Sequence, residues 1–134
     1  MSTHATGTYT TKSWDEQPFS EIEGAGKLTR ASVVDTFQGE IEGEATLEYL
    51  MAYRDDQFAS FVGLERVVGR IGDRAGSFVL RQNGTFENGV VTATWSVVPG
   101  SGTGELRGLR GEGGYRWDGQ HDQSATYTLD YDFA

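Results

Sequence analysis

The chain has 134 residues, which is enough for one domain built around a single core. Hydrophobic residues make up 37% and charged residues 23%, so the composition is that of a folding chain rather than a disordered one. The formal net charge of −9 would make nucleic acids and anionic membranes repel the surface, and we expect neither as a partner.

The residue inventory excludes several kinds of chemistry. Cysteine is absent, so there is no disulfide framework, thiol nucleophile or thiolate metal site. His4 and His121 share no motif, and there is no P-loop or dinucleotide fingerprint; we therefore expect no metal and no cofactor. The start lacks a basic stretch followed by an apolar run, and no segment approaches the about 20 apolar residues of a membrane span. A soluble cytoplasmic protein is the expectation.

Alternating hydrophobicity predicts strands along the whole chain. Nineteen glycines, two prolines and many short Thr-, Val- and Tyr-rich runs favour antiparallel β structure over helices. The predicted strands are 6–14, 28–37, 40–53, 58–70, 75–86, 90–98, 115–117 and 124–133. Successive strands with no helix to cover a sheet predict one all-β domain over 1–134, a closed eight-stranded antiparallel up-and-down barrel. A two-sheet sandwich is the alternative.

The segments between the strands are predicted as follows. The polar segment 15–26 is interpreted as a loop or flap, and the glycine-rich segment 99–114 as a bend with one helical turn around 106–109. The segment 54–57 is a polar four-residue turn. Asn88 and Gly89 form the clearest hairpin signal, because both central residues of a type I′ turn need a positive φ.

The turns determine which side chains share the interior face, because residues paired across a hairpin point to the same side. Across Asn88-Gly89, Gln82 pairs with Trp95. Across the preceding turn in the chain, Gly72-Asp73, Gly63 meets Gln82. Across 54–57, Glu48 meets Gly63. The interior face is then a mostly apolar wall that holds carboxylates, with Phe61, Gly63, Leu80, Gln82 and Trp95 as the predicted ligand-binding residues.

Glu48 and Glu65 are the candidate catalytic residues on that face. Two carboxylates in an apolar cavity cannot both ionise cheaply, so one would keep a proton that it could donate to a carbonyl or epoxide. The alternative is a structural role, in which a buried glutamate is satisfied by Gln82 or another polar group. Plain core packing is the alternative for Phe61 and Trp95.

The opposite face of 40–53 and 58–70 carries an apolar cluster, which on this register lies outside the barrel. Its residues are Leu47, Tyr49, Met51, Val62 and Leu64. Because a monomer rarely exposes such a patch, we interpret it as a homo-oligomer interface. The alternative is that the segment 15–26 folds over it.

Three stretches resemble an uncharacterised bacterial family, the domain of unknown function DUF3224. They are the run GSGTGELRGLRGEGGY at 100–115, FVGLE at 61–65 and EYLM at 48–51, and the ending YTLDYDF at 127–133 agrees. The glycine-rich run is also similar to the Gly-Thr-Gly segment of dirigent proteins. The resemblance implies an allene oxide cyclase-like eight-stranded barrel with a central cavity, commonly oligomeric. It implies no activity, and no catalytic motif of allene oxide cyclases matches this chain.

Three functions remain open from the sequence. The first is a barrel that binds a small, mostly apolar molecule in its cavity without catalysis. The second is a cyclase or isomerase acting on a hydrophobic intermediate, with Glu48 or Glu65 as acid or electrostatic guide. The third is a non-catalytic oligomeric structural protein with a filled barrel.

Overall fold

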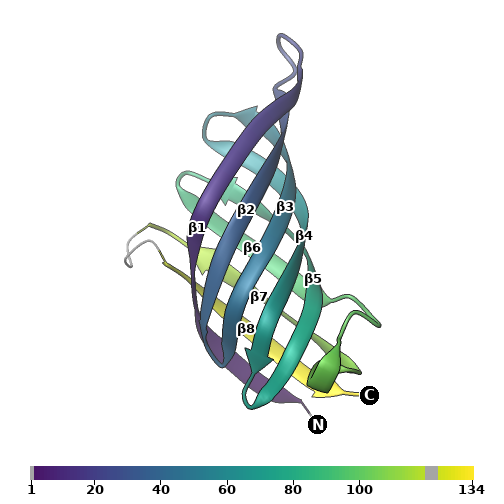
Figure 1. Cartoon of the computed structure of the whole chain (residues 1–134). Helices are drawn as coiled ribbons and strands as arrows, with labels where there is room; N and C mark the ends of the chain where they lie inside the picture. The colour runs from purple at the N-terminus through teal and green to yellow at the C-terminus, as the bar shows by residue number, and fades with distance from the viewer. Residues whose placement is uncertain (1, 120–123) are drawn as a thin grey trace.

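The computed structural model describes residues 2–119 and 124–134, which form a closed antiparallel barrel with strands in sequence order (Figure 1). The elements are β1 (Thr3–Glu21), β2 (Lys27–Gly39), β3 (Ile41–Asp55), β4 (Phe58–Ile71), β5 (Arg74–Glu87), β6 (Val90–Val97), the short 3₁₀ helix η1 (Gly104–Leu106), β7 (Leu109–Trp117) and β8 (Ser124–Phe133). The prediction of an eight-stranded up-and-down barrel is therefore confirmed. Among the described residues no helix is long and apolar enough to cross a membrane.

The barrel is longer on one side than on the other. Strands β1 to β5 have 13 to 19 residues, whereas β6, β7 and β8 have 8, 9 and 10. The seam pairs Thr3 of β1 with Tyr131 of β8 and runs to Thr10 opposite Ser124. Beyond this seam the β1–β2 hairpin projects past the short strands, at the end opposite the two chain termini (Figure 1).

Side chains pack the middle of the barrel. Phe37 lies 5.4 Å from Tyr127 and 6.0 Å from Trp95 between ring centroids, and Trp95 lies 5.2 Å from Tyr115. Phe78 and Leu80 are completely buried beside them. The interior is therefore a packed core at this level, as expected where eight strands leave room only for side chains.

The segment predicted as a loop at 15–26 is mostly strand, and this prediction was wrong. β1 continues to Glu21, paired with Lys27 of β2, through bulges at Thr11/Ser13 and Pro18/Ser20. Pro18 has no N–H to donate, but the described pairing of β1 with β8 has already ended at Thr10, so Pro18 lies on an edge that tolerates it. Backbone pairing with β2 thus overrides the polar composition.

A one-residue bulge moves β3 out of its predicted register. The turn 54–57 was expected to pair Leu50 with Phe61; instead Leu50 pairs with Val62 and Met51 with Phe61, because the pairing shifts between Tyr53 and Asp55. The bulge places one extra residue on β3. All the preceding side chains of that strand therefore point to the face opposite the predicted one.

The β2–β3 turn also differs from prediction, since Val33 pairs with Leu47 rather than Glu44. The error in the β3–β4 register and the error in the β2–β3 register each exchange the two faces of a strand, so for β2 the two exchanges cancel. Ala31 and Val33 therefore lie in the interior, on the face predicted for them.

The other turns and the glycine-rich segment agree more closely. Asn88 and Gly89 have φ values of 52° and 85°, as a type I′ turn requires, and the predicted β4–β5–β6 pairing is confirmed. The helical turn forms at Gly104–Leu106, earlier than predicted, and β7 begins at Leu109 rather than at Tyr115. Gly113 fits this strand because a Cβ there would lie 2.1 Å from the carbonyl oxygen of Thr128 on β8.

Candidate functional site

A polar network crosses the interior between β3, β4, β5 and β7. Gln82 donates from Nε2 to Oε1 of Glu65 at 2.9 Å, and its Oε1 accepts from the hydroxyl of Tyr115 at 2.6 Å and of Tyr49 at 3.3 Å. The two tyrosine hydroxyls lie 2.6 Å apart. Burial raises the pKa of Tyr49 and of Tyr115, so both phenols stay neutral at physiological pH.

Glu65 faces a second carboxylate, Asp35 of β2. Burial, and then the charge of Asp35, raises the pKa of Glu65 well above its usual value; burial also raises the pKa of Asp35. Oε2 of Glu65 is buried and has no hydrogen-bond donor, whereas Asp35 accepts from the hydroxyl of Thr11 at 2.8 Å. A proton on Glu65 that is donated to Asp35 satisfies both groups. The directions of these pKa shifts make Glu65 the member that keeps its proton and Asp35 the member that ionises.

Asp35 is the polar floor of a cavity at one end of the barrel, the end that carries the β1–β2, β3–β4 and β5–β6 turns. This end cavity has a volume of about 340 Å³, within the range of about 300–1,000 Å³ typical of ligand sites. Seven of its twelve lining residues are aromatic, and the others include Thr11, Val33, Met51 and Val91. The aromatic residues are Tyr9, Trp14, Tyr49, Tyr53, Phe61, Phe86 and Trp117.

The rim of the end cavity is organised by Glu16 on the projecting part of β1. Its carboxylate accepts hydrogen bonds from Thr29 at 2.6 Å, Tyr53 at 2.7 Å and Trp14 at 3.1 Å. Partial burial opposes ionisation, but these three donors hold the pKa of Glu16 below its usual value. The extension of β1 beyond its predicted end at Trp14 is thus what positions Glu16.

The two candidate glutamates lie on opposite sides of the wall. Glu65 is inside, 1% exposed, as predicted. Glu48 is outside, where it accepts hydrogen bonds from Arg30 at 2.7 Å and Ser32 at 3.0 Å, and these donors lower its pKa. The bulge at the end of β3 causes this difference, so the predicted Glu48–Glu65 pair does not exist. Asp35 takes the place of Glu48 beside Glu65.

The predicted ligand-binding residues are divided among three environments. Phe61 lines the end cavity, and Leu80 is core. Gln82 and Trp95 are interior and buried, with Gln82 in the polar network. The space predicted above Gly63 is filled, because a Cβ there would lie 3.0 Å from Cδ1 of Tyr49 and 2.8 Å from the carbonyl oxygen of Glu48. A leucine at this position would therefore clash with the wall.

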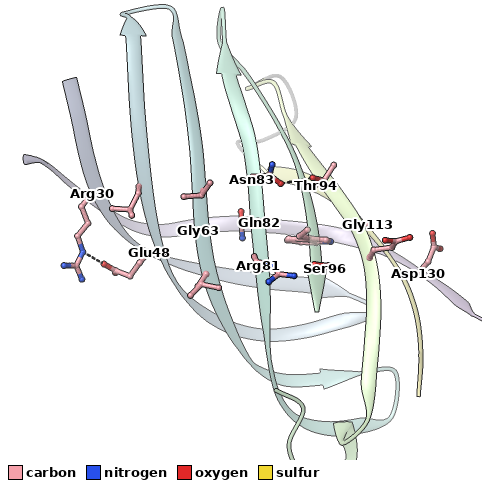
Figure 2. Close-up of a pocket in the computed structure, with 15 residues that line it drawn as sticks. Arg30, Glu48, Gly63, Arg81, Gln82, Asn83, Thr94, Ser96, Gly113 and Asp130 are labelled. Carbon is pink, nitrogen blue, oxygen red and sulfur yellow. Dashed lines mark hydrogen bonds and ion pairs between the residues drawn. The ribbon is translucent and has the colours of Figure 1, made fainter. Parts of the chain in front are cut away.

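A broad groove runs across the outer wall of the barrel over β3 to β8 (Figure 2). The Arg30–Glu48 pair borders it, with Arg81 and Glu112 among its polar residues and Leu64 among its apolar ones. Of the predicted interface residues, Val62 and Leu64 are on this outer face, whereas Leu47, Tyr49 and Met51 point inward and are buried. The exposed apolar side chains of β3 and β4 are instead Leu50, Val62, Leu64 and Val68.

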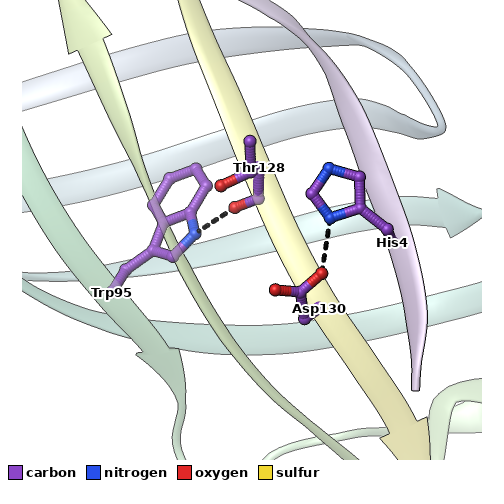
Figure 3. A network of polar contacts seen from close by, with 4 residues as sticks. All are labelled: His4, Trp95, Thr128 and Asp130. Atoms are coloured by element: carbon purple, nitrogen blue, oxygen red, sulfur yellow. Dashed lines mark hydrogen bonds and ion pairs between the residues drawn. The ribbon is translucent and has the colours of Figure 1, made fainter. Parts of the chain in front are cut away.

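The seam beside this groove is held by polar contacts that the sequence did not suggest. His4 Nδ1 contacts the carboxylate of Asp130, which joins β1 to β8 at the seam (Figure 3). Behind it, the indole of Trp95 on β6 donates to the carbonyl oxygen of Thr128 on β8 at 3.0 Å, across β7. His121 lies outside the described residues. Among those described, no group of three or more His, Cys, Asp or Glu side chains could hold a metal ion.

Sequence reasoning missed Asp35, the residue that brings charge to the cavity. A usable signal exists in β2, where Ala31, Val33 and Phe37 alternate with polar residues and Asp35 falls in phase with the apolar set. A carboxylate in phase with buried apolar residues indicates a buried acid. The meeting of Asp35 with Glu65 could not be found this way, because β3 separates their two strands.

The fold and the site define a class: a closed eight-stranded antiparallel barrel with a packed middle and an aromatic cavity at one end. The chain belongs to the family described as "Protein of unknown function (DUF3224)", whose model matches residues 5–131.

A solved structure agrees with this assignment. It is the crystal structure of a protein with unknown function from the DUF3224 family of Shewanella oneidensis MR-1. The two chains are 30% identical, and the match covers 100% of this chain and 99% of that one with a TM-score of 0.80. The resemblance to DUF3224 is thus confirmed. No curated protein matches the sequence.

Proposed function

We propose that this protein binds a small, mostly apolar molecule in the end cavity. The observation that carries the proposal is a ligand-sized space, about 340 Å³, lined mainly by aromatic side chains around one carboxylate. Ligand sites commonly combine such apolar walls with a few polar groups that orient the bound molecule. Trp14, 48% exposed at the rim, offers apolar surface that a ligand would cover.

The test is a fluorescence titration with N-phenyl-1-naphthylamine, a neutral apolar dye that brightens when it leaves water. Val91 lines the cavity, so Val91→Trp should fill the space and reduce dye affinity by about tenfold or more. Val90 is its neighbour on β6 and points to the other face, so Val90→Trp adds the same volume outside and should bind like the parent.

Saturable one-site binding that Val91→Trp weakens and Val90→Trp leaves unchanged supports the proposal. No saturable binding to the parent protein, or equal affinity in both variants, contradicts it.

The Asp35–Glu65 pair favours a second candidate function, that of an isomerase or cyclase. Asp35 lines the cavity as the anionic member of the pair, so its carboxylate could remove a proton from a carbon next to a ligand carbonyl and return it. Glu48 has no part in this scheme, because it faces solvent.

This second candidate predicts measurable proton exchange. In D₂O, the parent protein should exchange the α-protons of 4-phenyl-2-butanone faster than buffer does, as followed by NMR, and Asp35→Asn should exchange no faster than buffer. Glu48→Asn is the matched control and should keep the parent rate. Exchange at the buffer rate in the parent, or an unchanged rate in Asp35→Asn, contradicts the candidate.

A further inference from the structure

We infer that the end cavity selects organic cations, molecules with an apolar body and one positively charged nitrogen that lies against Asp35. The inference rests on the proposed binding function and adds the charge of the ligand to it. It is carried by three features: the charge on the floor, the absence of a countercharge among the lining residues, and the aromatic wall.

The floor carries one negative charge. Asp35 is the carboxylate of the cavity lining, where it accepts a hydrogen bond from Thr11. Burial and the charge of Asp35 raise the pKa of Glu65 well above its usual value, so Glu65 is the neutral member of the two and Asp35 the anionic one. The side-chain hydrogen bonds of these two residues in the described chain are with Thr11 and with Gln82, and neither of these groups is a cation. A charge withdrawn from water costs free energy unless an opposite charge accompanies it.

The lining residues include no lysine, arginine or histidine. The phenols of Tyr9 and Tyr49 are also neutral, because burial raises their pKa. Nothing among the twelve lining residues therefore compensates Asp35 or would attract an anionic ligand. The net charge of −9 adds a field that draws cations and repels anions.

The wall of the cavity suits a cation chemically. Indole and phenol rings attract ammonium groups through the negative faces of their π systems, and several such rings around a cation form an aromatic cage. The rim already shows this contact within the protein: Lys27 Nζ lies 4.7 Å from the ring centroid of Tyr53, whose hydroxyl donates to Glu16. A ligand cation that enters the cavity would meet Trp14 at the rim and the buried Tyr49, whose ring centroids are 5.7 Å apart.

The experiment compares three probes that share a phenyl group and differ in charge. They are 3-phenylpropylammonium, 3-phenylpropan-1-ol and 3-phenylpropanoate, titrated at pH 7.5 by calorimetry and by tryptophan fluorescence. The ammonium should bind about tenfold or more tightly than the alcohol, and the carboxylate most weakly.

Two variants locate the source of the preference. Asp35→Asn removes the floor charge and should bring the affinities for the ammonium and the alcohol to about the same value. Glu48→Gln removes one carboxylate from the outer wall, so it changes the net charge equally. It should keep the parent's preference for the ammonium.

The outcomes separate this inference from the binding function. If none of the three probes binds the parent, the proposed binding function fails, and the inference fails with it. If the alcohol or the carboxylate binds as tightly as the ammonium, the cavity is a binding site but the selection of cations is wrong. If Asp35→Asn keeps the tenfold preference, the assignment to Asp35 is overturned. The comparison of probes on the parent decides the matter even where Asp35→Asn does not fold.

Discussion

Glu65 shows at the scale of one residue how burial changes the chemistry of a side chain. On the surface its carboxylate would be ionised at neutral pH, as Glu48 is beside Arg30. In the interior, burial and the charge of Asp35 raise the pKa of Glu65, and its proton supplies the hydrogen bond that the acid pair requires. The same residue type is thus a surface ion on β3 and a neutral donor on β4.

The raised pKa makes stability depend on pH in a defined direction. A group whose pKa is raised in the folded state stabilises that state fully below its unfolded pKa, about 4.5, and the contribution is lost as the pH rises through the folded pKa. We therefore expect the unfolding free energy of the parent to decrease between pH 5 and 9 more steeply than that of Glu65→Gln. Urea denaturation at a series of pH values measures both slopes.

The glutamine variant is a matched control because its amide can donate to Asp35 while its oxygen accepts from Gln82. Glu65→Leu offers neither bond and should cost about 1–3 kcal/mol at acidic pH, where Glu65 is neutral in the parent. Parallel pH profiles for the parent and Glu65→Gln would show that Glu65 is ionised in the folded protein.

At the scale of elements, the hairpins determine which residues meet. The β5–β6 turn has the predicted type and sets Gln82 opposite Trp95, whereas one bulged residue in β3 exchanges the inner and outer faces of that strand. The cavity depends on this bulge, because it turns Tyr49 and Met51 inward and Glu48 outward.

Replacing Gly89 should destabilise the β5–β6 hairpin through conformation alone. Gly89 has a φ of 85°, and a Cβ there would contact nothing within 4 Å, so Gly89→Val introduces strain without a clash. We expect a loss of about 1–2 kcal/mol, the cost of a left-handed conformation for a residue with a side chain. Urea unfolding measures it, with Glu87→Val on the same hairpin as control, expected within about 0.5 kcal/mol of the parent. Equal losses in the two variants would argue against the φ-based explanation.

At the scale of the whole molecule, the outer apolar face suggests self-association. Leu50, Val62 and Leu64 are 51%, 53% and 56% exposed on neighbouring strands. Arg81 and Glu112 line the same groove, and neither has an ion-pair partner within the described chain. We propose that a second copy covers this face about a two-fold axis, which would let Arg81 of each copy meet Glu112 of the other.

Changing this face should alter the oligomeric state. The parent is expected to sediment as a dimer at micromolar concentration, and Leu64→Lys as a monomer, because burying an unpaired ammonium in an apolar interface is unfavourable. Thr10→Lys adds the same charge on the outer face of β1, away from the groove, and should remain dimeric. A monomeric parent, or a dimeric Leu64→Lys, contradicts this proposal.

Local pattern by itself determined the strand order and the faces of β4, β5 and β6, and so placed Glu65 and Gln82 inside. These follow from alternation and from the turn at Asn88-Gly89, which are properties of neighbouring residues.

Only the tertiary structure decided the content of the site. The bulge after Tyr53 reassigned every side chain of β3, and backbone pairing with β2 extended β1 past Trp14 and so placed Glu16 at the rim. Asp35 and Glu65 belong to strands that are not adjacent, and they meet only because the closed barrel turns both toward its interior. Alternation along one strand says which residues share a face, but the face that points inward depends on the register with its neighbours, and that is a long-range property.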